Sequence, residues 1–169
     1  IEYCLTLAGI SIKDLNNLII GWNLKKYPTL MQSFYAGLHQ RYETNDWVQA
    51  REQASIKRFS EPNTISLLKK DLAHLLKDGQ LPRIDCYDHH YAHAASSYYC
   101  SQFDEALVLV IDAKGEENST TIWVGQNTEL TCIASWTIPH SIGWFYAAIT
   151  EFLGWRANYD EGKVMGLSS

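Results

Sequence analysis

Three histidines lie in one short stretch of the sequence, and two of them are spaced so that they could bind a metal ion together. His89 and His93 are four residues apart. In a helix this spacing brings both side chains onto one face, and neutral imidazole binds iron, zinc, copper or nickel. His90 would point about 100° away on the same helix, so we expect it to support the ligands from behind or to face substrate. Surface or capping pairs have the same spacing, so the spacing alone leaves both interpretations open.

A carboxylate follows the apolar run 107–111, which has the length of a strand. Together with His89 and His93, the side chain of Asp112 would form a set of two histidines and one carboxylate that leaves coordination positions open. Such a set is typical of catalytic or phosphate-bridging ions rather than of closed structural sites.

Two polar segments could hold phosphate. In the loop 112–120, backbone N–H groups near Gly115 could approach an anion closely, although an ordinary hairpin turn has the same composition and the loop is not a Walker-type glycine loop. In the segment 160–167, Gly162 and Gly166 bracket Lys163. We predict a phosphate contact for this lysine, with an exposed loop lysine as the alternative.

The elements that must position these residues are both helical and extended. The helix ending at Gly9 is followed by a helical turn near 11–15, and the run 107–111 is predicted to be a central strand buried on both faces. With two further strands it would form a three-strand antiparallel meander. The other expected elements are strands at 18–22, 82–87, 120–124 and 129–138, and helices at 31–42, 46–58, from Asn63 or Thr64 to Gly79, from 88 through 95, and from Ser141 to Gly154.

The fold class expected from this order is α/β. Three strands followed by a helix, with an acidic glycine-containing turn after the first strand, form the opening unit of an actin-like or ribonuclease-H-like ATPase lobe, an inference by fold analogy. We therefore expect a partial fold that straddles two lobes, with residues 1–102 from the first lobe and 103–169 from the second. Because the sequence starts within a helix and lacks an initiator methionine, we expect it to be a fragment.

The amino-acid composition disfavours several classes of function for this chain. Hydrophobic residues make up 46% of the chain, so it can bury a core, and the net charge of −5 does not favour nucleic acid as a partner. The four cysteines form no Cys-x-x-Cys pair, which disfavours a zinc knuckle or a redox motif. No apolar run approaches the roughly 18 residues of a membrane span, so we expect a cytoplasmic protein with no membrane partner.

Taken in series, these motifs resemble the nodulation and antibiotic-tailoring O-carbamoyltransferase family. That family carries His-His-x-x-His-Ala, then Asp-Gly-x-Gly-Glu, His-Ser-Leu-Gly-x-Phe-Tyr and Glu-Gly-Lys-Val-Met-Gly-Leu. The corresponding segments here are 89–94, 112–116, 140–146 and 161–167. Two departures are Ala113 in place of a glycine and Cys100 where proline is common. The first could alter the phosphate loop, because alanine tolerates a positive φ poorly.

The resemblance implies a site and a reaction. A divalent ion, iron(II) by expectation, would be held by His89, His93 and Asp112, with a further carboxylate ligand beyond Ser169, and it would hold ATP phosphates. Members of the family use carbamoyl phosphate and ATP to make a carbamoyl-adenylate in a separate C-terminal domain, and transfer the carbamoyl group to a hydroxyl of a sugar or natural product. The isolated chain should be inactive. The residues expected at the nucleotide are Lys114, Gly115, Gly143, Glu161, Gly162 and Lys163.

Two other interpretations remain open from the sequence. One is a hydrogenase-maturation or tRNA threonylcarbamoyl-type relative that shares the fold and the histidine pair. The other is a non-enzymatic actin-like module that binds nucleotide and metal.

Overall fold

A computed structural model describes residues 1–76 and 79–168, which form a mixed α/β structure divided into two compact units, Ile1–Asp88 and His89–Ser169. The division lies between 88 and 89, whereas the sequence placed it after 102, because the histidine-bearing helix packs on the sheet that follows it. The assignment of the two parts to actin-like lobes stays a prediction. Residues 77–78 of the helix expected to end at Gly79, and Ser169 at the end of the second part, lie outside the described residues.

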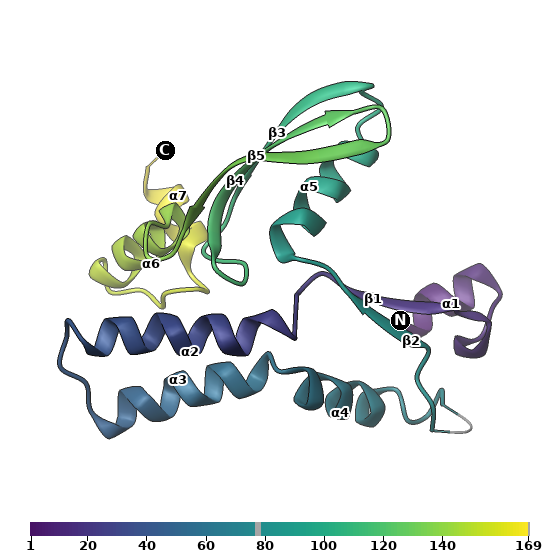
Figure 1. The fold of residues 1–169 in the computed structure, drawn as a ribbon, viewed down its shortest axis with the longest axis horizontal. Helices are drawn as coiled ribbons and strands as arrows, with labels where there is room; N and C mark the ends of the chain where they lie inside the picture. Colours follow the sequence, from purple (N-terminus) through teal and green to yellow (C-terminus); the bar gives the residue numbers. More distant parts are fainter. Residues whose placement is uncertain (77–78, 169) are drawn as a thin grey trace. The chain divides into compact units, whose positions relative to one another are not determined.

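The first unit contains a pair of parallel strands joined by a helical crossover. Strand β1 pairs with β2 in parallel, with Asn17 opposite Arg83 and Ile20 opposite Cys86, and parallel strands require such a long connection. Helices α2 and α3 of the crossover run side by side (Figure 1). The elements in chain order are α1 (Glu2–Ala8), the 3-10 turn η1 (Ile12–Asp14), β1 (Asn17–Ile20), α2 (Lys26–His39), α3 (Asp46–Arg58), α4 (Glu61–Asp71) and β2 (Arg83–Cys86).

Local sequence explains where most of these helices begin and end. Gly9 closes α1 with a φ of 67°, as expected, because glycine enters the left-handed region without strain. Asn45 caps α3 by accepting a hydrogen bond from the Val48 N–H. The prediction for α4 was wrong at both ends: the helix begins at Glu61, with a proline in its first turn, and ends at Asp71.

The core of the first unit explains why α4 stops early. After Asp71 the chain continues through turns that place Leu72 and Leu76 against Leu5 and Ile12. The leucines that were expected to face a core do so: Leu72 and Leu76 are buried in it, and Leu68 and Leu75 are partly buried and pack against it.

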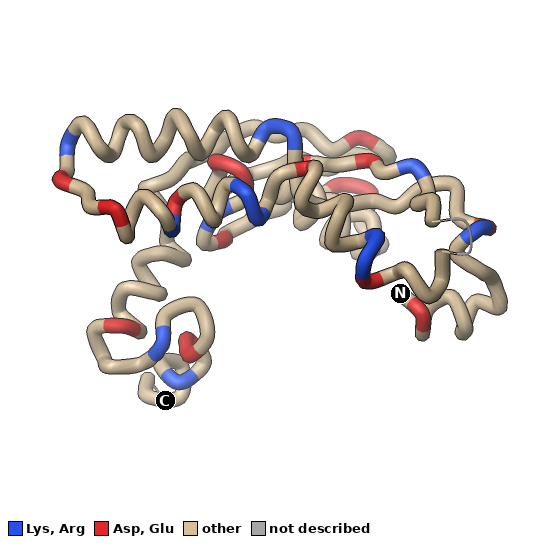
Figure 2. The backbone as a smooth tube through the Cα atoms, turned by 90° about the horizontal axis from the view of Figure 1, so that it is seen from below, with Lys and Arg blue, Asp and Glu red and all other residues tan. Residues whose placement is uncertain are grey.

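Charged residues of both signs are interspersed along the first unit (Figure 2). Lys26 Nζ lies 3.0 Å from Asp88 Oδ2, and an Arg83 nitrogen lies 2.9 Å from Asp85 Oδ1. The Lys26 and Arg83 side chains are exposed and their aspartate partners are partly exposed, so each pair contributes at most about 1 kcal/mol to stability.

The second unit is a three-strand sheet with helices. Its strand order is β3-β4-β5, all antiparallel, which confirms the predicted meander. Helix α5 lies along one face of the sheet (Figure 1), where Ala94 and Tyr98 pack against Val108 and Val110. The elements are α5 (His89–Tyr99), β3 (Glu105–Ile111), β4 (Asn118–Gln126), β5 (Glu129–Thr137), α6 (Ile142–Phe152) and α7 (Glu161–Leu167).

Strand β3 differs from its prediction. It lies at the edge of the sheet, and only one of its faces is buried: Val108 and Val110 are covered, while Leu107 and Leu109 are 69% and 57% exposed. An unbroken apolar run makes both faces of a strand apolar, but burial also needs a covering layer, and within this unit α5 supplies one layer only.

The segment 160–167, for which the sequence left a phosphate contact or an exposed loop lysine open, is helix α7 from Glu161 onward. The acidic residue in its first turn favours a helix start there, because carboxylates are stabilised near helix N-termini. Among the residues that the structure describes, no helix combines the length and apolar character needed to cross a membrane.

Candidate metal centre

The histidine pair lies on one face of α5, as its spacing predicted. The Nε2 atoms of His89 and His93 are 3.0 Å apart, and their rings are nearly perpendicular, at 78°. His90 points to the other side of the helix and is 2% exposed, with its Nδ1 atom 3.0 Å from the Thr121 hydroxyl. Burial lowers the pKa of His90, which favours its neutral form. His90 thus packs behind the pair, against Thr121 of β4.

Asp112, directly after β3, completes the group. Its Oδ2 atom lies 2.9 Å from His89 Nε2 and 3.6 Å from His93 Nε2. One ligand atom from each of the three residues lies within 4.8 Å of the others, and among residues 1–76 and 79–168 this is the only such group of three or more potential ligands. The His93 side chain is half exposed, so the group is accessible from one side, which leaves room for ligands from solvent or substrate.

The electrostatics of Asp112 suit a metal ligand. The hydrogen bond with His89 lowers the pKa of this carboxyl; burial opposes that effect, and the Ala113 N–H and the histidine charges add to it. The carboxylate is therefore ionised at neutral pH. Two imidazole nitrogens and an anionic oxygen that converge in this way present lone pairs to one point, which a cation would satisfy.

The loop that carries Asp112 is fixed to the start of α6. The Ser141 hydroxyl donates to the Ala113 carbonyl at 2.6 Å, and the Asp112 N–H donates to the Ser119 carbonyl at 2.9 Å. A Cβ atom added to Gly143 would lie 2.6 Å from the Ala113 Cα, so only glycine allows this close approach. Ala113 itself does not adopt a positive φ, so its replacement of the family's glycine causes no backbone strain.

Gly115 serves to bring the same loop against α5. A Cβ atom at this position would lie 2.8 Å from His90 Cδ2 and 3.2 Å from His89 Cβ. Its N–H donates to the Asn118 carbonyl at 2.6 Å, so this donor is already engaged within the loop. Lys114 is partly buried beside it, and the phosphate contacts expected of both residues stay predictions.

The remaining residues expected at a nucleotide belong to α7. The Glu161 carbonyl accepts a hydrogen bond from the Tyr146 hydroxyl, and Lys163 Nζ lies 2.9 Å from Asp160 Oδ1. An added Cβ at Gly162 would meet no atom within 4 Å. The structure therefore brings Gly115 and Gly143 to the three potential ligands, whereas the described ion pair of Lys163 is with Asp160.

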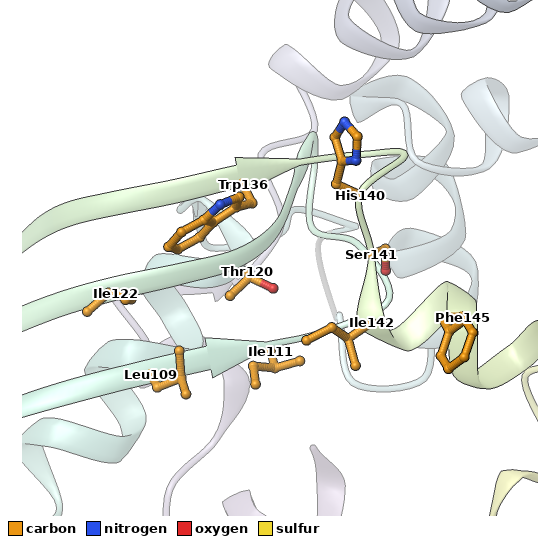
Figure 3. A pocket seen from close by; sticks show the side chains of 9 residues that line it. All are labelled: Leu109, Ile111, Thr120, Ile122, Trp136, His140, Ser141, Ile142 and Phe145. Carbon is orange, nitrogen blue, oxygen red and sulfur yellow. The ribbon is translucent and has the colours of Figure 1, made fainter.

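An apolar cavity of about 590 Å³ lies on the face of the sheet opposite α5 (Figure 3). Its walls come from alternate residues of β3, from β4 and β5, and from the beginning of α6. Most of the lining is hydrocarbon, which suits an apolar surface rather than a phosphate. The lining residues are Leu109, Ile111, Thr120, Ile122, Trp136, His140, Ser141, Ile142 and Phe145.

Sequence reasoning missed two buried polar residues next to the potential ligands. Thr121 is fully buried and holds His90, and the 5% exposed Glu116 accepts a hydrogen bond from the His89 backbone N–H. A signal for Glu116 was present, because it stands directly after Gly115 in a motif that had been recognised.

Comparison with known proteins identifies the family of the chain. The sequence matches the family described as Carbamoyltransferase N-terminus over residues 1–169. The chain belongs to the carbamoyltransferase N-terminus family. This confirms the resemblance drawn from the four motifs.

Relatives of this carbamoyltransferase N-terminal chain are much longer than the chain. An uncharacterized protein of Synechocystis sp. is 36% identical over 99% of the chain, which covers 27% of that protein. The nodulation protein NolNO of Sinorhizobium fredii is 28% identical, also over 99% of the chain, and the match covers 22% of NolNO. The nodulation protein NolO of Bradyrhizobium diazoefficiens is 37% identical over 48% of the chain and 15% of its own length. The chain thus spans about a quarter or less of the relatives it matches.

Proposed function

We propose that this chain is the metal-binding part of an O-carbamoyltransferase. The observation that carries the proposal is the convergence of His89, His93 and Asp112 within 4.8 Å in a chain of the carbamoyltransferase N-terminus family. In the proposed reaction, carbamoyl phosphate is hydrolysed to carbamate and phosphate, carbamate displaces pyrophosphate from ATP to give a carbamoyl-adenylate, and a hydroxyl of a sugar or natural product then takes the carbamoyl group with release of AMP.

We propose iron(II) as the bound ion. Two imidazoles and one carboxylate with open positions form a donor set that suits this ion, and the three side chains here fit it in type, in convergence and in access to solvent. The ion would supply positive charge that neutralises phosphate oxygens.

The chain's own residues would position the reactants. The Asp112 carboxylate, held ionised by His89, would keep the ion on the loop that faces the nucleotide, and the Ser141 hydroxyl would keep that loop against α6. Lys114 and Lys163 are the proposed phosphate contacts. Fixed groups of this kind lower a barrier because they need no reorganisation during the reaction.

The proposed fold is the actin-like or ribonuclease-H-like ATPase fold, with the β3-β4-β5 meander and α6 as the opening unit of one lobe. The antiparallel strand order and the acidic turn after β3 support this assignment. A C-terminal adenylate-forming domain in a longer parent protein is part of the same proposal.

The experiment that tests the function is an assay of the full-length protein for AMP formation that depends on carbamoyl phosphate. We expect His89→Ala and Asp112→Ala to lose both bound iron and most of this AMP formation, while the exposed Glu117→Ala keeps them. Full activity and unchanged iron content in the first two variants would contradict the assignment. ATP binding without any AMP formation by the wild-type protein would favour a non-enzymatic module.

A further inference from the structure

Glu116 is a buried carboxylate that contacts the histidine-bearing helix and has no role in the site described so far. Its side chain is 5% exposed, and its two oxygens lie 3.2 and 3.1 Å from the backbone nitrogen of His89, the first residue of α5. Burying a carboxylate is unfavourable unless hydrogen bonds compensate. The contact with the His89 N–H is therefore part of what allows this side chain to be buried.

The contact joins α5 to the loop between β3 and β4, and the metal ligands converge only when these two elements are correctly placed relative to each other. Asp112 and Glu116 belong to the same loop between β3 and β4, whereas His89 and His93 belong to α5. The first N–H groups of a helix lack partners within the helix, and an anion at that end is favoured by the helix dipole. A carboxylate that accepts the His89 N–H thus fixes the start of α5 directly to the loop that carries Asp112.

Gly115 makes this attachment possible. Because it has no side chain, the loop can approach so closely that an added Cβ would lie 3.2 Å from His89 Cβ. The neighbouring Glu116 then reaches the backbone of the same histidine. A shift of the loop relative to α5 would change the 2.9 Å separation between His89 Nε2 and Asp112 Oδ2.

We propose that Glu116 is a positioning residue for the metal centre, which sets the distance between the histidine pair and Asp112 without binding the ion. This inference rests on the metal site put forward under the proposed function. Residues that orient a metal ligand typically contribute about 10- to 100-fold to metal affinity.

The test is a titration of the metal-free protein with Co²⁺, followed by the visible absorption of the bound ion. We expect Glu116→Ala to weaken Co²⁺ binding by about 10- to 100-fold. Glu116→Gln keeps an acceptor oxygen of the same reach and should stay within a few-fold of wild type. Glu116→Asp keeps the charge but is one methylene shorter, so it should lose affinity and give an altered spectrum. Glu117→Ala removes an exposed carboxylate from the next position and serves as the matched control.

The outcomes separate the two proposals. If Glu116→Ala and Glu116→Asp bind Co²⁺ as tightly as wild type while His89→Ala does not, the positioning role is wrong and the metal site stands. If wild type and His89→Ala bind Co²⁺ equally, the metal site itself is wrong. Should Glu116→Ala fail to fold, the contrast between the aspartate and glutamine variants decides, since a merely structural carboxylate would change stability but not the affinity or spectrum of the folded protein.

Discussion

Asp88 in the first unit and Asp112 in the second both have a carboxyl pKa below the ordinary 3.8, but for different reasons. At Asp88, partial burial raises the pKa, and hydrogen bonds from Asn23 and Lys26 outweigh it. At Asp112, the hydrogen bond with His89 is the largest effect. One aspartate is held by an ammonium group and an amide, and the other by imidazole.

The comparison shows how the same side chain can form an ion pair in one place and a potential metal ligand in another. Lysine carries a permanent charge at neutral pH, so Asp88 already has its counter-ion at 3.0 Å. Imidazole binds metal only in its neutral form, so a group of Asp112 with two metal-binding imidazoles keeps a net negative charge. That charge is what a divalent cation would balance.

The largest expected effect is on metal affinity. Asp112→Ala should weaken Co²⁺ binding by more than about 100-fold, because it removes a ligand rather than a residue that only supports one. Asp14→Ala is the matched control, since it removes a carboxylate whose pKa is also lowered from the first unit, far from α5 in the sequence, and it should leave the affinity within about two-fold. Calorimetric titration measures both. Equal losses in the two variants would break the contrast between the aspartates.

Bound metal should stabilise one unit selectively. At a Co²⁺ concentration about 100 times the dissociation constant, linkage predicts roughly 2.7 kcal/mol of protection against opening of the metal-binding unit. Amide hydrogen exchange should therefore slow in α5 and at the end of β3, while α2 and α3 exchange as before. Chelation should reverse the effect. Uniform slowing across both units would mean that the ion does not act locally.

The two units can also be compared by replacing one glycine in each with alanine. Gly143→Ala should lower the free energy of unfolding by about 1–3 kcal/mol, because its Cβ would meet the Ala113 backbone at 2.6 Å and displace the Asp112 loop. Gly37→Ala, within α2 of the first unit, meets no atom within 4 Å and should raise stability by up to about 1 kcal/mol. Urea unfolding of both variants tests this. The expectation is wrong if both changes have the same sign.

The smallest effect concerns the structural aspartate and its pH dependence. Asn23→Ala removes a donor to Asp88 and should cost about 0.5–1 kcal/mol at pH 7, a value discounted because the Asp88 side chain is 45% exposed. Since the folded pKa of Asp88 is lowered, this stability is present above 3.8 and disappears as the pH falls through the folded pKa. The difference in stability between the variant and wild type should therefore shrink as the pH falls below 3.8, leaving only the part that comes from the hydrogen bond of the Lys26 N–H to Asn23 Oδ1.

The exposed Asn16→Ala provides the control for that measurement, because its effect should not change between pH 7 and pH 3. A pH-independent cost of Asn23→Ala would show that the amide acts on packing rather than on the charge of Asp88.

Local patterns were sufficient to predict much of the fold. The left-handed Gly9, the Ser141 cap and the helical face shared by His89 and His93 depend on neighbours within a few residues, and the meander follows from strand-length runs joined by short turns; each is present. The bounds predicted for α4 were wrong because Ser60 and its following proline offer a competing helix start, and helix α7 after Asp160 was not predicted. Whether a strand face is covered is not a local property, which is why β3 was misjudged.

The sequence by itself determined which residues could bind metal and that His89 and His93 share one face of a helix, because helical geometry follows from spacing alone. Only the tertiary structure decided that Asp112 reaches them, that Gly115 and Gly143 are needed for close backbone approaches, and that the buried Glu116 contacts the His89 backbone. These contacts join residues about 20 to 30 positions apart in the sequence, and such distances depend on how strands and helices pack rather than on the order of the residues along the chain.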